Sequence, residues 1–95
     1  MPYTVYILAN GSNRALYVGL TVNLSRRVEQ HKTGRGSEHT ARYGITRLVW
    51  SETFDDLEEA RLHERRLKRW RRAWKDALIS KTNPRWDDLA ELQPV

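Results

Sequence analysis

Two short, mainly apolar runs lie in the first 20 residues of the chain. Residues 3–9 and 14–20 are rich in β-branched and aromatic side chains, and residues 10–13 between them read Asn-Gly-Ser-Asn. Two such runs separated by a short turn that contains glycine and asparagine are typical of an antiparallel β-hairpin. The sequence therefore predicts a hairpin over residues 3–20.

The length of the turn determines which residues of the hairpin lie opposite one another. A four-residue loop pairs Ala9 with Arg14 and places Tyr6 directly opposite Tyr17. Because side chains alternate between the faces of a sheet, one face then carries Thr4, Tyr6, Leu8, Ala15, Tyr17 and Gly19, and the other carries Val5, Ile7, Leu16 and Val18. We expect the aliphatic face to join the core and the tyrosine face, with a glycine gap, to line a surface. Ordinary packing of aromatic side chains across a hairpin would also explain the two tyrosines.

The rest of the pattern predicts helices and one further strand. The predicted segments are a helix over 24–32 capped by Thr21 or Asn23, a flexible basic loop over 33–44 and a third strand over 45–52. A long helix capped by Thr53 or Asp55 follows and runs toward Trp70. We expect it to break near Arg71 or Arg72 and to continue to about Lys81. Asn83 and Pro84 end this helix, and Trp86 anchors the tail that follows. The order β-β-α-β-α-α indicates an α+β fold, with helices flanking a small, three-stranded, mainly antiparallel sheet.

Composition excludes several classes of protein. The 95 residues suit one small domain, and without cysteine the chain can form neither a disulfide nor a thiolate metal site. It lacks an apolar run long enough to cross a bilayer, and residues 1–4 show no signal-peptide pattern, so we expect a cytoplasmic protein without membrane association. The 17 basic and 12 acidic residues give a formal net charge of +5. This excess favours an anionic partner, of which nucleic acid is the commonest large one.

The positive charge is concentrated in one stretch. Residues 61–75 hold many of the basic side chains, and Glu64 is the only acid among them. Such a cluster attracts the phosphates of nucleic acids. Alternatively, it is only a solvated basic face, or it contacts a membrane surface or an acidic protein. The residues predicted to contact nucleic acid are Arg35, Arg65, Lys68, Arg69, Arg72 and Lys75.

The predicted helix over 24–32 carries two residues suited to phosphate chemistry. Arg27 and His31 are four residues apart, so they are neighbours on one side of the helix, within about a quarter turn of the inward-facing Leu24. Arg26 points nearly the opposite way. We therefore expect Arg27 to face the sheet, where its guanidinium could grip a phosphate with two hydrogen bonds. Alternatively, Arg27 only extends past the core to solvent while His31 packs or caps the helix.

Glu64 lies on the margin of the apolar stripe of the long helix, which is formed by Leu57, Ala60, Leu67 and Trp70. A carboxylate in such a position is costly unless it is paired or binds a cation. Glu64 therefore either pairs with a neighbouring arginine or holds a divalent ion. Mg²⁺ commonly takes one or two protein carboxylates together with water and phosphate oxygens.

The other histidines and the tryptophans carry weaker signals. His39 and His63 form no zinc pattern with His31. The tryptophans are expected to pack in the core and between helices rather than to stack on bases; they are Trp50, Trp70, Trp74 and Trp86.

The order of these residues resembles the GIY-YIG nuclease family. Val5-Tyr6 stands where the family has its first motif, and Tyr17-Val18-Gly19 matches its second. Further matches are Thr21, Asn23, Leu24, Arg27 and His31 in the helix that follows, the metal-binding glutamate segment from Glu64 to Trp70, and Asn83-Pro84-Arg85-Trp86, the ending of the small stand-alone bacterial members. The resemblance covers nearly the whole chain and implies a nuclease-like domain over 1–82, with a tail over 83–95 that packs on it or extends from it. One departure is Thr4, which replaces the glycine of the first motif.

The resemblance implies a metal-dependent DNA endonuclease that hydrolyses phosphodiester bonds, with branched or damaged DNA in repair or recombination as the expected substrate. Glu64 would hold a single divalent ion, Mg²⁺ or Mn²⁺, and Arg27 would bind the phosphate. Tyr6 would help to deprotonate or position the attacking water, with Tyr17 lining the same pocket. His31 would position Tyr6 or the water, or carry a proton.

Two other functions are consistent with the sequence. A nucleic-acid-binding module could use the same fold and basic helix without catalysis, and Glu64 would then be only an ion-pair partner. An adaptor for acidic proteins would have no affinity for DNA at moderate salt. The target would come from a protein partner or from the shape of DNA. The sequence leaves open the oligomeric state and the choice between DNA and RNA.

Overall fold

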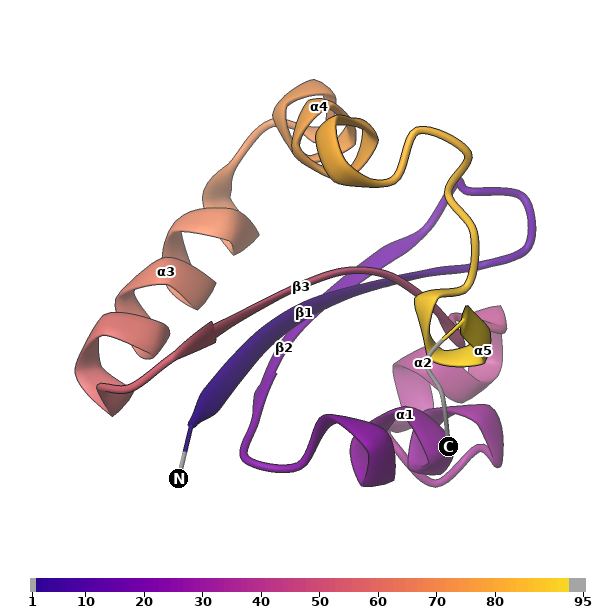
Figure 1. Cartoon of the computed structure of the whole chain (residues 1–95). Coiled ribbons are helices and arrows are strands. Elements are labelled where there is room, and N and C mark those ends of the chain that lie inside the picture. Colours follow the sequence, from indigo (N-terminus) through magenta and orange to yellow (C-terminus); the bar gives the residue numbers. More distant parts are fainter. Residues whose placement is uncertain (1, 93–95) are drawn as a thin grey trace.

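A computed structural model of the chain describes residues 2–92, which contain one three-stranded antiparallel sheet (Figure 1). The strands are β1 (Tyr3–Ala9), β2 (Leu16–Thr21) and β3 (Arg47–Phe54), with β1 in the centre. The helices are α1 (Leu24–Lys32), α2 (Glu38–Tyr43), α3 (Leu57–Arg69), α4 (Arg72–Thr82) and α5 (Leu89–Leu92). The predicted α+β class and the order of the strands and long helices are confirmed.

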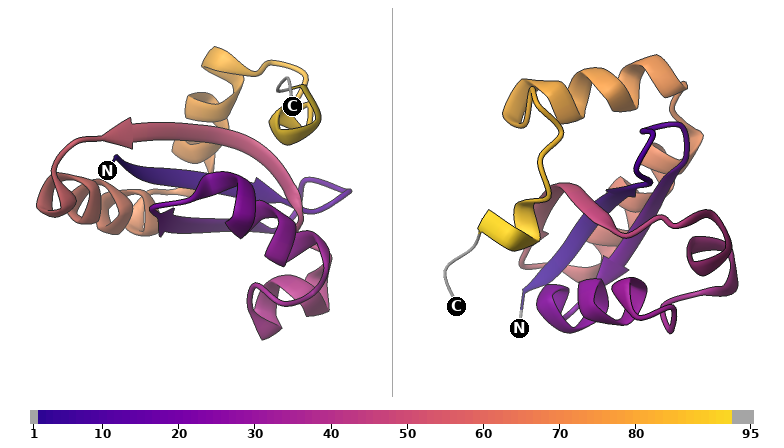
Figure 2. Two further views of the ribbon diagram at one scale, coloured as in Figure 1. Left: turned by 60° about the horizontal axis from the view of Figure 1, so that its bottom comes forward. Right: turned by 90° about the vertical axis from the view of Figure 1, so that its right-hand side faces the viewer.

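Helices cover both faces of the sheet. α3 and α4 lie on one side of it, and α1 and α2 lie on the other (Figure 1, Figure 2). On the α3 side the buried core consists of Val5, Ile7, Ala9, Val18, Val49, Trp50, Ala60, Leu67 and Ile79. On the α1 side it consists of Tyr6, Leu8, Val28, Ile45 and Leu48. None of the helices within residues 2–92 is both long and apolar enough to cross a membrane.

The predicted register of the hairpin is wrong by two residues. Instead of pairing with Arg14, Ala9 pairs with Leu16. Tyr6 consequently lies opposite Gly19, and Tyr17 lies opposite Leu8. The two tyrosines are therefore diagonal neighbours on adjacent strands rather than a directly opposed pair.

The register differs because the loop of the hairpin is longer than expected. The side-chain oxygen of Asn10 accepts hydrogen bonds from the backbone amides of Arg14, at 2.9 Å, and Ala15, at 3.1 Å. Asn13 adopts the left-handed conformation, with φ of 59°, which asparagine tolerates better than most residues. These contacts keep residues 10–15 out of the ladder. Because the shift is an even number of residues, every side chain keeps the face that the sequence predicted.

The tyrosine face of the sheet is core and not the expected surface. Tyr6 is fully buried, and Tyr17 is half-buried. A Cβ atom on Gly19 would lie 2.4 Å from the Tyr6 ring. The expected gap at this glycine is therefore filled by the Tyr6 ring, and a larger residue there would have to displace it.

Helix α1 has the predicted boundaries, and Asn23 caps it by accepting a hydrogen bond from the Arg26 amide. The predicted break in the long helix is also confirmed, because Trp70 and Arg71 have extended backbones between α3 and α4. The first helix and this break are both specified by local sequence.

Helix α2 lies in a segment that was predicted to be a flexible loop. Ser37 caps this helix by accepting a hydrogen bond from the Thr40 amide at 3.1 Å. Gly44 ends it in the left-handed conformation, with φ of 63°. The helix has only six residues and stands between glycines, so its hydrophobic periodicity is too short to recognise.

Strand β3 begins and ends two residues later than predicted. Ile45 is fully buried, and its amide donates to the carbonyl of Thr40 at 2.9 Å, which completes the end of α2 before the strand can start. Thr53 consequently belongs to β3, and Asp56 caps α3 in place of Thr53 or Asp55.

The segment that follows α4 packs against β3. Asn83 donates from its side-chain amide to the carbonyl of Val49 at 3.1 Å, and the Asp88 carboxylate accepts from the amide of Leu48 at 3.2 Å. Trp86 packs against the core on the α3 side. The sequence did not predict α5, which has four residues. Residues 93–95 of the predicted tail lie outside the described residues.

Gly19→Ala should destabilise the protein. The added methyl group would overlap the Tyr6 ring, and overpacking of this kind costs about 1–3 kcal/mol. We expect the midpoint of urea unfolding to fall while the slope of the transition stays unchanged. Gly11→Ala is the matched control, because a Cβ atom at Gly11 meets no atom within 4 Å. Equal destabilisation of the two variants would contradict the close contact between Tyr6 and β2.

Candidate active site

The Tyr6 hydroxyl is the centre of a group of polar side chains on the α1 side of the sheet. Its oxygen lies 3.1 Å from His31 Nε2 and accepts a hydrogen bond from Arg27 Nε at 3.4 Å. Tyr6 comes from the middle of β1, whereas Arg27 and His31 come from successive turns of α1. Arg27 thus faces the sheet, and Arg26 is exposed.

Tyr17 of β2 completes an aromatic cluster with Tyr6 and His31. The centroid of its ring is 6.3 Å from that of Tyr6 and 5.2 Å from that of His31. The diagonal placement of the tyrosines in the sheet lets the imidazole pack against both rings. Three of the residues predicted for catalysis are therefore in mutual contact.

The Arg27 guanidinium is held in place on several sides. Besides its contact with Tyr6, Nη1 donates to the Gln30 side chain at 3.0 Å and Nη2 donates to the Gly36 carbonyl at 2.9 Å. The hydrogen bond to Tyr6 is the main cause that raises the pKa of Arg27. A hydrogen bond from Arg27 to Tyr17 also raises this pKa.

A second chain of hydrogen bonds reaches the other nitrogen of His31. Nδ1 lies 3.0 Å from the hydroxyl of Thr40, which in turn lies 2.9 Å from the hydroxyl of Ser37 and donates to the Ser37 carbonyl at 3.2 Å. His31 and Thr40 are fully buried. A Cβ atom on Gly36 would lie 2.2 Å from His31 Nδ1, so the loop before α2 closes directly over the imidazole.

Thr40 and Ser37 are not among the site residues predicted from the sequence. One signal was available, because a serine followed by a glutamate is a frequent start of a helix, as at Ser37 and Glu38. Nothing in the sequence indicates that Thr40 would point at His31, since that contact depends on how the loop after α1 returns to the sheet.

Burial shifts the titration of the two central residues in opposite directions. Burial is the main cause that raises the pKa of the Tyr6 phenol, and the hydrogen bond from Arg27 opposes it. Burial, followed by the positive charge of Arg27, lowers the pKa of His31. Because burial disfavours the charged form of each group, at neutral pH the site contains a protonated phenol beside a neutral imidazole.

Glu64 lies on α3 and pairs with a lysine of the same helix. Its side chain is 19% exposed, and Oε2 lies 3.4 Å from Lys68 Nζ. Burial is the main cause that raises the pKa of Tyr6, and the negative charge of Glu64 is the last of the influences that follow it. Within residues 2–92, no three His, Cys, Asp or Glu side chains are grouped so as to hold a metal. A single carboxylate of this kind fits an ion that takes its other ligands from water and phosphate.

The predicted nucleic-acid-binding residues lie in different surroundings. Arg72 is tied to the protein, because it donates to the carbonyl of Arg14 at 2.6 Å and to the carboxylate of Asp76 at 2.7 Å. Lys68 pairs with Glu64. Lys75 is partly buried, and the other five members of the set are exposed.

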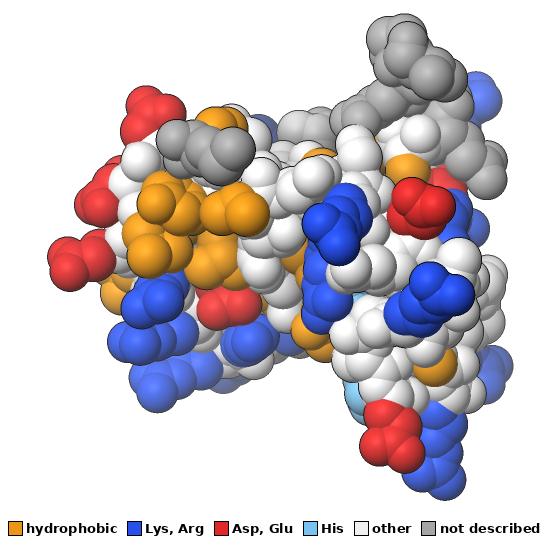
Figure 3. All heavy atoms as spheres, turned by 90° about the horizontal axis from the view of Figure 1, so that it is seen from below, with side chains coloured by type: hydrophobic (Ala, Val, Ile, Leu, Met, Phe, Trp, Pro, Cys, Tyr) orange, Lys and Arg blue, Asp and Glu red, His pale blue; other side chains and the backbone are white. Residues whose placement is uncertain are grey.

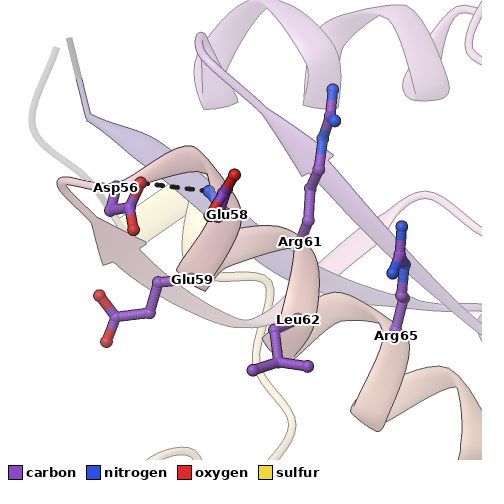
Figure 4. Close-up of a pocket in the computed structure, with 6 residues that line it drawn as sticks. All are labelled: Asp56, Glu58, Glu59, Arg61, Leu62 and Arg65. Carbon is purple, nitrogen blue, oxygen red and sulfur yellow. Dashed lines mark hydrogen bonds between the residues drawn. The ribbon is translucent and has the colours of Figure 1, made fainter.

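Basic side chains also gather on the outside of the molecule. Lys and Arg form several groups on the face shown in Figure 3, and one group borders a hydrophobic patch. Arg61 and Arg65 extend from neighbouring turns of α3 toward the same side (Figure 4). They line a depression of about 590 Å³ together with Asp56, Glu58, Glu59 and Leu62. This depression contains none of the residues around Tyr6 and is therefore separate from the candidate active site.

Trp74 differs from the expectation that the tryptophans pack in the core. It is 53% exposed, whereas Trp50 is buried. Trp70 and Trp86 are partly buried and pack against the core on the α3 side. The Trp74 ring contacts that of Trp70, as expected of packing between helices, but more than half of the residue remains exposed.

A comparison with models of protein families identifies the family to which this chain belongs. A family model described as the GIY-YIG catalytic domain matches residues 2–77. The chain belongs to the GIY-YIG nuclease family. The match includes the strands, α1 and α3, which carry all five residues predicted for catalysis.

Several curated relatives of this GIY-YIG protein are UPF0213 proteins. The protein from Vibrio cholerae is 40% identical over 80 residues, covering 83% of this chain and 78% of the relative. The protein from Halalkalibacterium halodurans is 32% identical over 92 residues and covers 97% of both chains. A solution NMR structure of a UPF0213 protein from Bacillus halodurans matches the fold with a TM-score of 0.60 at 30% identity, over 100% of both chains.

Thr4 marks the one departure from the first GIY-YIG motif. It is buried within β1 and pairs with Thr21 of β2 and Thr53 of β3. The strand therefore continues regularly through this position, and Tyr6 reaches its place on the tyrosine face.

The pH dependence of stability should report on His31. Its folded pKa lies below the ordinary value of 6.5, so the unfolded state binds more protons once the pH falls below about 6.5. The free energy of unfolding, measured with urea, should then decline as the pH falls from about 7.5 toward 5.5. His31→Gln should flatten this decline, and the exposed His39→Gln should keep it. A decline that is equally steep in all three proteins would contradict the assignment.

Proposed function

We propose that this protein is a metal-dependent DNA endonuclease that acts on branched or damaged DNA. The observation that carries the proposal is the buried Tyr6 hydroxyl in contact with Arg27 and His31, and the charge of Glu64 is the last of the influences on the pKa of this phenol, which burial chiefly raises. Folding alone would favour apolar side chains at these buried positions, because polar groups stabilise a core only when all of them are satisfied.

Arg27 is suited to bind the scissile phosphate. Its contacts with Tyr6, Gln30 and Gly36 fix the plane of the guanidinium. A guanidinium held in this way can contact a phosphate without a search for the right rotamer. A donor that is already oriented stabilises the charge that develops on the phosphate in the transition state.

Tyr6 and His31 are suited to move a proton. The Thr40 hydroxyl donates to the Ser37 carbonyl, so it can accept from a proton on His31 Nδ1. His31 Nε2 is then free to accept the phenolic proton of Tyr6 while the Tyr6 oxygen takes a proton from the attacking water. The phenol stays neutral throughout, which avoids the cost of a buried phenolate. Tyr17 packs beside both rings and limits their movement.

Glu64 is the residue that would hold a divalent ion, Mg²⁺ or Mn²⁺. Such an ion would supply Lewis-acid chemistry to the phosphate and to the leaving oxygen. Its partner in the present structure, Lys68, can transfer to a backbone phosphate of the bound strand. Arg35, Arg65, Arg69, Arg72 and Lys75 would add phosphate contacts along the same substrate, although Arg72 already has partners within the protein.

Such contacts to phosphates carry no sequence information. We therefore propose that the target is chosen by the shape of the DNA or by a partner protein. Repair or recombination in the cytoplasm would supply branched and damaged DNA as substrate.

Removal of the Glu64 charge should abolish cleavage. Glu64→Gln keeps the size of the side chain but loses the charge needed to hold a divalent ion, so we expect the rate to fall by about 10²-fold or more. The assay uses labelled flaps, forks, four-way junctions, single strands and plain duplexes with Mg²⁺ or Mn²⁺. Glu59→Gln is the matched control, because Glu59 is an exposed acid on the same helix.

Binding of the same substrates separates this proposal from its alternative. Without divalent ions, Glu64→Gln should bind the preferred substrate at least as well as the unaltered protein does. Wild-type protein that binds every substrate of the panel and cuts none of them would instead be a nucleic-acid-binding module, with Glu64 only the ion-pair partner of Lys68.

Removal of the Tyr6 hydroxyl should affect the chemical step more than the binding of substrate. Tyr6→Phe keeps the ring that fills the space over Gly19 but breaks the path to His31. We expect the single-turnover rate to fall by about 10²- to 10⁴-fold, the usual contribution of general acid–base catalysis, with little change in affinity. Tyr3→Phe, on the opposite face of β1, should cleave normally. A Tyr6→Phe variant with an unchanged single-turnover rate would exclude a role for the phenol in proton transfer.

A further inference from the structure

We propose that the indole ring of Trp74 is a stacking platform for an unpaired base of the nucleic acid. The inference rests on the proposed function and deepens it, because it assigns the protein a substrate that contains unpaired nucleotides. Trp74 lies in the first turn of α4, directly after the break that follows α3, and 53% of the residue is exposed. Burial, which explains the other tryptophans, does not explain this one.

The ring is held in a fixed orientation. Trp70, which packs on the core, contacts it at nearly a right angle, with an interplanar angle of 86° and 6.1 Å between centroids. Arg72 anchors the start of α4 to the hairpin loop through the carbonyls of Asn13 and Arg14, and this loop approaches the junction of α3 and α4 in Figure 2. A rigid aromatic surface loses little conformational entropy when a base stacks on it.

The surroundings of the ring are positively charged. The guanidinium carbon of Arg71 lies 5.6 Å from the centroid of the Trp74 ring. The first turn of α4 contains no acidic residue, and the carboxylate of Asp76 is already paired with Arg72. An aromatic face combined with arginines matches a nucleotide, because the base can stack while its phosphate meets the cation. An acidic peptide would use the arginines but would leave the aromatic face without a partner.

The platform lies within reach of a strand bound at the candidate active site. Trp70, at the end of α3, follows Glu64 by six residues, which is about 9 Å along the helix axis. One strand of a duplex advances about 3.4 Å per nucleotide along its axis. A strand that runs along α3 from a phosphate near Glu64 would therefore reach the junction of α3 and α4 about three nucleotides away.

The test compares two oligonucleotides that differ only in their bases. The probes are a 15-nucleotide oligothymidine and a chain of equal length with abasic sites throughout, titrated without divalent ions so that no cleavage occurs. Stacking of one base corresponds to roughly 5- to 150-fold in affinity. We expect the wild-type protein to prefer the base-bearing strand by a factor in this range, with quenching of tryptophan fluorescence. Trp74→Ala should reduce the preference to near one, and Trp74→Phe should keep part of it.

Tyr43→Ala is the matched control. Tyr43 is also an exposed aromatic residue, at 51%, with Arg42 placed 5.8 Å from its ring, but it lies on α2 beside Glu38. This variant should keep the preference for bases. Affinity for the abasic strand and its dependence on salt should be the same in Trp74→Ala and wild type, because the phosphate contacts are unchanged.

The outcomes distinguish this inference from the proposed function. A Trp74→Ala variant that keeps the full preference for bases overturns the platform, even if the protein cuts DNA. Loss of the preference in Tyr43→Ala as well as in Trp74→Ala also overturns it, because the effect would not be specific to the junction of α3 and α4. Absence of binding to every nucleic acid by the wild type would instead remove the proposed function and this inference with it.

Discussion

The buried hydroxyl of Tyr6 is the constraint on which the arrangement of this domain depends. A phenol that is removed from water must find hydrogen-bond partners within the protein, since an unpaired polar group in a core costs more than a hydrogen bond contributes. Both partners, Arg27 and His31, come from α1. The orientation of α1 on the sheet is therefore fixed by polar contacts as well as by the packing of Val28.

The same constraint extends outward to the surrounding loops. The Tyr6 ring needs the space over Gly19, and the His31 ring needs the space beneath Gly36. The second imidazole nitrogen needs Thr40, which brings α2 against α1. A chain of hydrogen bonds of this kind is stable only when each polar group in it has a partner. The short helix α2 therefore belongs to the site, although it lies between glycines in the sequence.

Local rules predicted much of this arrangement. The two-residue period of strands assigned each hairpin side chain to its face, and the helical period separated Arg27 from Arg26. What failed depends on contacts that no local pattern encodes. The register was set by the side chain of Asn10 folding into the loop, and the contact between Thr40 and His31 forms only after the chain has returned to the sheet.

Helix α3 joins two electrostatic tasks that the proposed function requires. The negative charge of Glu64 is among the influences on the pKa of Tyr6, and Lys68, one turn later, pairs with Glu64 at 3.4 Å. A divalent ion and Lys68 would compete for the same carboxylate, whereas a phosphate strand would draw Lys68 toward itself. Binding of nucleic acid would then increase the affinity for the ion, and by linkage the ion would increase the affinity for nucleic acid to the same degree. A single protein carboxylate is weak in isolation, so this coupling would load the ion chiefly where a substrate is present.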